Sequence, residues 1–217
     1  MKPAIALVVA SAMLAGCHFH IGSGEQITGS GKVKSEKRAA DEFTRIRLNM
    51  PASVEVEVGK TQLVEISADD NILPKITSSV GSGELRLDLK NGSYTNSTIR
   101  VRIQVPSLEA CEINGAGTIN IVGLKGSEFR AKINGSGAVT AAGAVSSTDS
   151  NISGSGTIDL HGVKSDNADT HINGSGNILL NASKVVDAKI NGSGSVEVAG
   201  GAQINESING SGVVTKK

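Results

Sequence analysis

The pentapeptide Ile133-Asn134-Gly135-Ser136-Gly137 occurs, with small changes, six times in the second half of the chain. Successive copies are 18 to 20 residues apart and begin at Ile113, Ile133, Ile152, Ile172, Ile190 and Ile208. A near-constant period of this length is typical of a solenoid, in which one small unit is repeated and each copy packs on its neighbours. The repeat therefore decides the fold.

The residues on both sides of each pentapeptide alternate between apolar and polar. In the first copy, Ile119 and Ile121 follow the last glycine, while Cys111 and the polar Glu112 precede the isoleucine. A period of two predicts β-strands with one buried face, and the high glycine content argues against helices. Four copies have a further glycine after the second strand, which predicts a second bend: Gly123, Gly143, Gly162 and Gly200.

Stacking such units in register predicts an all-β fold, a parallel β-helix or solenoid with coils of about 18–20 residues. Inward-facing Ile, Val and Leu would form apolar columns, and each pentapeptide asparagine would join a hydrogen-bonded ladder with a shorter rung at Ser153. Glycines beside the serine permit positive φ and close approach of neighbouring coils. The predicted structural residues are Asn114, Asn134, Asn173, Asn191 and Asn209 in the ladder, and Gly135, Gly137, Gly174 and Gly176 at the corner.

The start of the chain has the pattern of an export signal. Its apolar run, residues 4–15, is too short to cross a bilayer, since a spanning helix needs about 20 apolar residues, but it fits a secretory signal peptide. Leu14-Ala15-Gly16-Cys17 resembles the bacterial lipobox. We therefore expect residues 1–16 to be a lipoprotein signal peptide, with cleavage between Gly16 and Cys17 and acyl chains on Cys17. The alternative is an ordinary signal peptide with a chance cysteine.

Acylation of Cys17 would place the protein in the bacterial cell envelope, because two or more acyl chains hold a protein stably at a membrane. The next residue is His18, not the aspartate that commonly marks inner-membrane retention, so we expect the outer membrane, facing the periplasm or the exterior. An acylated Cys17 also leaves Cys111 without an intrachain disulfide partner. We expect Cys111 to be a small core residue.

Composition predicts the remaining organisation. Residues 17–31 are rich in Gly, Ser and Thr and are predicted to be a flexible tether. Residues 32–217 are predicted to be one domain, with a cap or first coils to about residue 107 and the Gly-Ser-Gly repeats over 108–217. The stretch 43–107 lacks the pentapeptide but keeps the alternation, so it is predicted to form further strands or a β-cap over the open end of the columns.

Charge and aromatic content exclude several functions. The chain has 21 basic and 21 acidic residues, so it has no electrostatic reason to bind nucleic acid. Aromatic residues make up 2% of the chain, which argues against stacking on sugars or single-stranded nucleic acid. The motifs for a phosphate loop, a zinc site or a Ser-His-Asp triad do not occur in the sequence, and we expect no cofactor and no metal.

The ordered set Phe43-Thr44-Arg45-Ile46-Arg47-Leu48, Gly83-Glu84-Leu85-Arg86-Leu87 and Val105-Pro106-Ser107-Leu108, followed by the repeats, resembles the head GIN domain family of bacterial exported proteins. The resemblance covers the chain from about Gly29 to its end. It implies a right-handed β-helix-like fold and frequent lipoprotein anchoring. It implies little about activity, because the family's adhesin label rests on analogy with autotransporter heads and it has no established catalytic residues.

The sequence therefore favours a non-enzymatic, lipid-anchored envelope protein with a structural or interaction role, adhesin-like, acting on an envelope protein or glycan through a strand face or the solenoid's end. One alternative is a binder, hydrolase or lyase of envelope polysaccharide, for which Asp159 and Glu197 share a repeat position. Another is an accessory for envelope assembly. Asp166 and Asp169 are candidate calcium ligands, but the calcium-binding nonapeptide is missing from the sequence.

Overall fold

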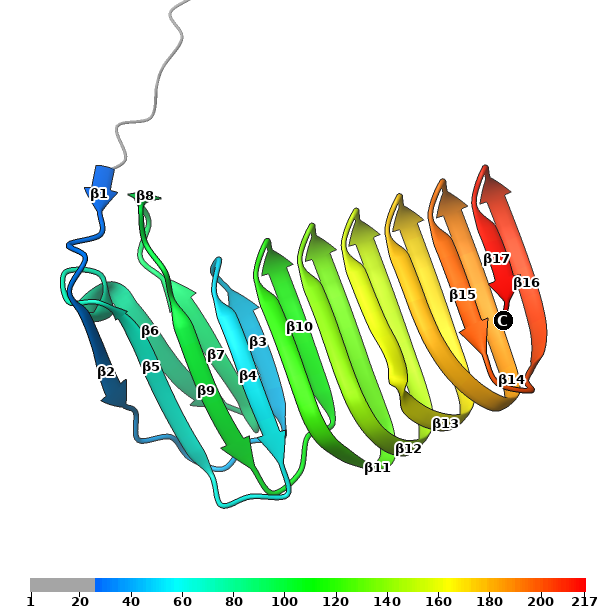
Figure 1. Cartoon of the computed structure of the whole chain (residues 1–217), viewed down its shortest axis with the longest axis horizontal. Coiled ribbons are helices and arrows are strands. Elements are labelled where there is room, and N and C mark those ends of the chain that lie inside the picture. The colour runs from blue at the N-terminus through cyan, green and yellow to red at the C-terminus, as the bar shows by residue number, and fades with distance from the viewer. Residues whose placement is uncertain (1–25) are drawn as a thin grey trace, which may run out of the picture.

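The structure is a computed structural model, and it describes residues 26–217, so the predicted signal peptide, the cleavage site and Cys17 lie outside the described residues. The chain forms a parallel β-solenoid of about five turns, which confirms the fold predicted from the repeat (Figure 1). Within residues 26–217, no helix has the length and apolar character needed to cross a membrane.

The repeats form long strands that pass through a bend and so contribute to two facing layers (Figure 1). The first coil of the repeat begins with β10 (Ala110–Gly115), and the last contains β15 (Ser195–Ala199), β16 (Gln203–Gly210) and β17 (Val213–Lys216). Between them lie β11 (Thr118–Gly135), β12 (Ala138–Gly154), β13 (Thr157–Gly174) and β14 (Asn177–Gly192). All these strands pair in parallel, and each pentapeptide isoleucine lies opposite the next.

The stretch before the repeats contains both first coils and a cap. Parallel strands β3 (Arg45–Asn49) and β4 (Ser53–Val58) pair with β10 and β11, and β7 (Glu84–Leu89) and β9 (Arg100–Val105) continue the two layers. The outermost strands are antiparallel: β2 (Val33–Lys37) and β5 (Leu63–Asp69) in one layer, and β6 (Ile76–Gly81) in the other. A short 3-10 helix, η1 (Leu73–Lys75), lies in the connection between β5 and β6.

The prediction of a flexible tether up to residue 31 is wrong for residues 26–31. Strand β1 (Gln26–Thr28) pairs in parallel with β8 (Ser93–Thr95). The Gly31 backbone N–H then donates to Asp69 Oδ1 at 2.7 Å, and Ser30 Oγ donates to Asp70 Oδ1 at 2.6 Å. Side chains far along the sequence therefore hold this polar segment, which its composition alone does not show.

One apolar core runs through the whole stack. The pentapeptide isoleucines of the inner coils are buried, and Ile172 and Ile190 are 0% exposed, whereas Ile208 of the last coil is 38% exposed. Full burial of such a side chain contributes about 1.5–3 kcal/mol. The repeated columns therefore supply much of the stability of residues 108–217.

Candidate functional site

The Gly-Ser-Gly corner is where neighbouring backbones come closest. Gly135 has φ +136°, and a Cβ built on it would lie 2.5 Å from the carbonyl oxygen of Gly115 in the preceding coil. Gly174 has φ +132°, and its Cβ would collide with the carbonyl oxygen of Gly154. Gly137 and Gly176 likewise have no room for a side chain. These four residues serve the stacking of coils.

The pentapeptide asparagines lie along the outside of one layer and are joined in two groups. Asn134 Nδ2 donates to Asn114 Oδ1 at 2.8 Å, and Asn114 Nδ2 donates to Asn49 Oδ1 at 2.7 Å. Beyond Ser153, Asn191 Nδ2 donates to Asn173 Oδ1 at 3.1 Å. Asn209 lies in register at the end of the column. Asn49, at the end of β3, is also a member of the ladder, and the repeat alone does not identify it.

Cys111 is buried, as expected for a small core residue, and burial raises its pKa to about 12. A thiol with so high a pKa is a poor nucleophile at neutral pH, because the thiolate is the reactive form. The buried position between coils excludes contact with a substrate in the folded state.

Asp159 and Glu197 lie in one column with Leu179 between them. Glu197 Oε1 is 2.5 Å from Lys217 Nζ and 3.9 Å from His161 Nδ1, and Asp159 accepts the backbone N–H of His161 at 3.0 Å. Glu197 is therefore ion-paired with Lys217, whereas Asp159 bonds to the backbone. The two carboxylates have different partners and are separated in the column by Leu179.

The two candidate calcium ligands, Asp166 and Asp169, have different neighbours. Asp166 accepts hydrogen bonds from Lys184 Nζ at 3.1 Å and Ser183 Oγ at 3.0 Å, and the bond from Lys184 is the largest cause of its lowered pKa. Asp169 belongs to a different column, in register with Asp149 and Asp187. Within residues 26–217, no group of three or more His, Cys, Asp or Glu side chains is arranged to hold a metal ion.

Sequence reasoning missed this second acidic column on the outside of the repeat layer. Asp149, Asp169 and Asp187 occupy successive coils, and Arg130 and Asn205 lie in register at its two ends. Burial, and then the charge of Asp169, raise the pKa of Asp149. Counting back a fixed number of residues from each pentapeptide isoleucine would have found the column.

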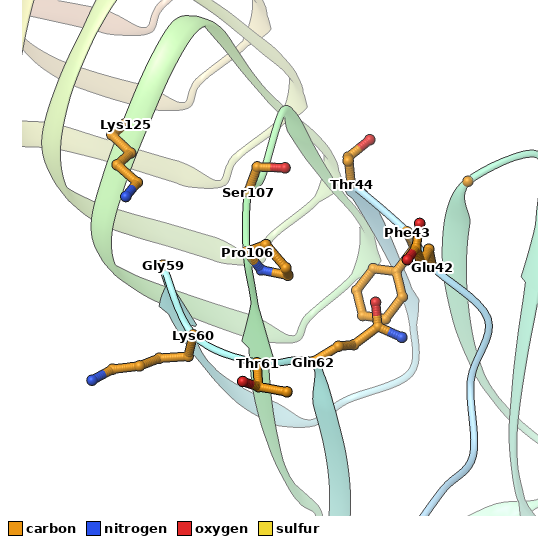
Figure 2. Close-up of a pocket in the computed structure, with 11 residues that line it drawn as sticks. Glu42, Phe43, Thr44, Gly59, Lys60, Thr61, Gln62, Pro106, Ser107 and Lys125 are labelled. Carbon is orange, nitrogen blue, oxygen red and sulfur yellow. The ribbon is translucent and has the colours of Figure 1, made fainter.

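An open hollow of about 990 Å³ lies at the bend between the cap and the repeats. Four connections form it: residues 59–62 between β4 and β5, residues 106–107 after β9, the segment that precedes β3, and Gly83 between β6 and β7. The bend of β11 adds Lys125. Figure 2 shows Lys60 and Lys125 on one side of this hollow and Glu42 on the other.

Hydrogen bonds to backbone carbonyl oxygens hold the walls of the hollow in place. The N–H groups of Gly59 and Lys60 both donate to the carbonyl oxygen of Val105, at 2.8 and 3.1 Å. Gln62 Nε2 donates to the carbonyl oxygens of Ala40 and Asp41, both at 2.9 Å. The connections are therefore held to the neighbouring strands although they carry no regular secondary structure.

The chemistry of the hollow suits a polar, acidic ligand. Lys60 Nζ lies 3.5 Å from Glu57 Oε1, and the ammonium group of Lys125 lies over Gly59. The exposed hydroxyls of Thr61 and Ser107 add neutral hydrogen-bonding groups. Phe43 is 3% exposed, so its ring is not available to stack on a sugar. The lining contains cationic and hydroxyl groups but no nucleophile beside a histidine base.

Comparison with known proteins agrees with the fold. The family model described as "Putative auto-transporter adhesin, head GIN domain" matches residues 42–202. A "putative adhesin" from Bacteroides fragilis has 22% identity and a TM-score of 0.68, over 88% of this chain and 98% of that one. A "putative lipid binding protein" from Parabacteroides distasonis has 22% identity and a TM-score of 0.56, over 89% and 100%.

A third solved structure, a "putative adhesin" from Parabacteroides merdae, has 19% identity and a TM-score of 0.52, over 89% of this chain and 100% of that one. At these identities the structures show a shared fold. No curated protein matches the chain. Because the family model covers most of its length, the chain belongs to the head GIN domain family, which has no known catalytic activity.

Proposed function

We propose that this protein is a lipid-anchored, adhesin-like interaction protein of the bacterial cell envelope, without catalytic activity. The observation that carries the proposal is the position of the two ends of the stack. Strand β1 lies at one end and β17 at the other (Figure 1). An acylated Cys17 would hold the β1 end near the membrane, and the rigid coils would present their outer faces, including the hollow between the cap and the repeats, to a partner.

The hollow at the cap is the contact surface that the geometry favours. Its two lysines and two hydroxyls fit a carboxylate or phosphate group of an envelope glycan or protein, since charged hydrogen bonds to such groups are stronger than neutral ones. The family description as an adhesin supports a binding role. The cell-envelope location, and the outer membrane in particular, follow from the lipobox-like residues and from His18.

The anchor is tested by Cys17→Ala. We expect an unprocessed precursor without acyl chains, measured by membrane fractionation and intact-mass spectrometry, with Cys111→Ala as the control that keeps processing. A mature, acylated product from Cys17→Ala would contradict the anchor.

The contact surface is tested by Lys60→Glu with Lys125→Glu, using binding of the purified chain to envelope glycan and membrane-protein fractions. We expect about a tenfold loss of affinity, which corresponds to about 1.4 kcal/mol, and weaker binding at high salt. The matched control is Lys164→Glu with Lys189→Glu, two exposed lysines on other coils. An equal loss in the control pair would place the contact elsewhere, while intact anchoring with no binding to any fraction would contradict the adhesin-like role.

A further inference from the structure

The two ends of the solenoid finish differently. At the N-terminal end the layers finish in the antiparallel strands β2 and β6, and β2 is fully exposed and carries Lys34, Glu36 and Lys37. At the C-terminal end they finish in the parallel strands β16 and β17. Within the described residues, no further strand pairs with the outer edges of these two strands. An edge of this kind is a template for pairing with another chain.

In the last coil, two of the inward-facing columns end in charged residues. From Cys111 onward, one of these columns holds small buried residues until it reaches Glu206; they are Ala131, Ser150, Thr170 and Ala188. In the facing layer, Leu180 and Val198 are buried, and the next residue in register is Lys216. Two inward positions that are small or apolar in the inner coils therefore carry opposite charges at the end.

Lys216 reaches across the open end of the solenoid. Its ammonium group donates to the carbonyl oxygen of Ala202 at 2.9 Å, in the bend between β15 and β16. The next residue, Lys217, points to the outside and pairs with Glu197. The alternation along β17 thus places the Lys216 side chain over the apolar columns, where Ile204 and Val214 are only partly buried.

We propose that Glu206 and Lys216 are gatekeepers that keep the C-terminal end of the solenoid from stacking on a second copy. A copy added at this end would enclose both charged groups between two apolar layers. Burying an ionised side chain costs several kcal/mol unless it gains a well-placed partner, which outweighs the pairing of short edge strands. Inward-pointing charges are a known means of protecting sheet edges. The two charges therefore keep this end from stacking on a second copy.

The test replaces both residues by those of the coil beneath, Glu206→Ala and Lys216→Val, in the full chain. Sedimentation velocity over a range of concentrations should show self-association at least about a hundredfold tighter than for the unmodified protein, equivalent to about 2.8 kcal/mol. Adding Val213→Cys to each protein locates the contact. Disulfide-linked dimers should form in the double variant and remain rare with Val213→Cys alone.

The matched control changes two outward positions on the same strands, Ser207→Ala and Lys217→Val, and should leave the protein monomeric. Glu206→Ser with Lys216→Val supplies a second variant, because the column already accepts Ser150, and far-UV circular dichroism checks that each variant folds. The proposal is overturned if the folded inward variants stay monomeric, if the outward control associates equally, or if Val213→Cys alone crosslinks to the same extent.

Discussion

The cap, residues 26–107, and the repeats, residues 108–217, close the same core by different means. In the repeats, like residues stack on like residues, and the close approach at the corner depends on glycine. In the cap, unlike side chains are paired: Arg47 binds Glu84 of the neighbouring strand at 2.9 Å and Glu112 of the first repeat coil at 3.1 Å. Backbone fit therefore dominates in the repeats, whereas specific side-chain pairs join the cap to them.

The largest expected effect comes from breaking the corner. Gly174→Val should destabilise the protein by about 3–5 kcal/mol, because the side chain forces a strained φ and a collision with Gly154. Thermal unfolding followed by circular dichroism measures the change. Ser175→Ala is the control, since Ser175 is exposed and its backbone bond to Gly154 is unaffected, and it should alter stability by less than about 0.5 kcal/mol.

The next effect compares an inner coil with the end of the stack. Ile172→Ala removes a fully buried side chain and should cost about 3 kcal/mol. Ile208→Ala, at the same repeat position in the last coil, should cost less than about 1 kcal/mol because its side chain is already partly exposed. Denaturant unfolding of both variants gives the difference, and equal losses would mean that the last coil is covered in solution.

The charged joint between cap and repeats should have a smaller, pH-dependent effect. The bond from Arg47 is the largest cause of the lowered pKa of Glu84, so its stabilisation is present above the ordinary glutamate value of 4.5 and is lost as pH falls through the lower folded pKa. Arg47→Met should cost about 1 kcal/mol at neutral pH. Unfolding measured against pH should show the two proteins converging in acid, and a constant gap would argue against the ion pair.

Removing the charge of Asp149 in the acidic column should have the smallest effect on stability, and this change should stabilise the protein. A raised folded pKa means that ionised Asp149 is disfavoured in the folded protein, so stability rises as pH falls through that pKa. Asp149→Asn should therefore stabilise the protein at neutral pH by about 0.5 kcal/mol. Urea unfolding at neutral pH measures this gain, and destabilisation would show that the charge of Asp149 is used by Arg130 or another partner.

The repeats could be predicted in detail from the sequence because stacked coils place equivalent residues in contact. The inward isoleucines, the asparagine ladder and the burial of Cys111 all follow from the period. The cap could be predicted only as strands, since alternation identifies a buried face but not whether the neighbouring strand is parallel. The pairing of β1 with β8 joins residues 67 apart, and the bond between Gly31 and Asp69 joins residues 38 apart, with no repeated pattern.

The hollow could not be predicted from the sequence either, because four connections that are far apart in the chain form it. Its lysines lie in ordinary bends and carry no motif. The acidic column could have been predicted, because Asp149, Asp169 and Asp187 each lie the same number of residues before a pentapeptide isoleucine. The neighbouring residues in these segments vary, which makes the column hard to recognise.

The stacking of pentapeptides in register is tested most directly by disulfide formation between successive corners. The corner residues Ser136 and Ser155 are exposed and belong to neighbouring coils, about 4.8 Å apart, so Ser136→Cys with Ser155→Cys meets the distance for a disulfide. Non-reducing peptide mapping should show rapid intramolecular bonding of this pair and none for Ser136→Cys with Ser175→Cys, two coils apart. Equal bonding of both pairs, or bonding of the distant pair alone, would contradict the stacked solenoid.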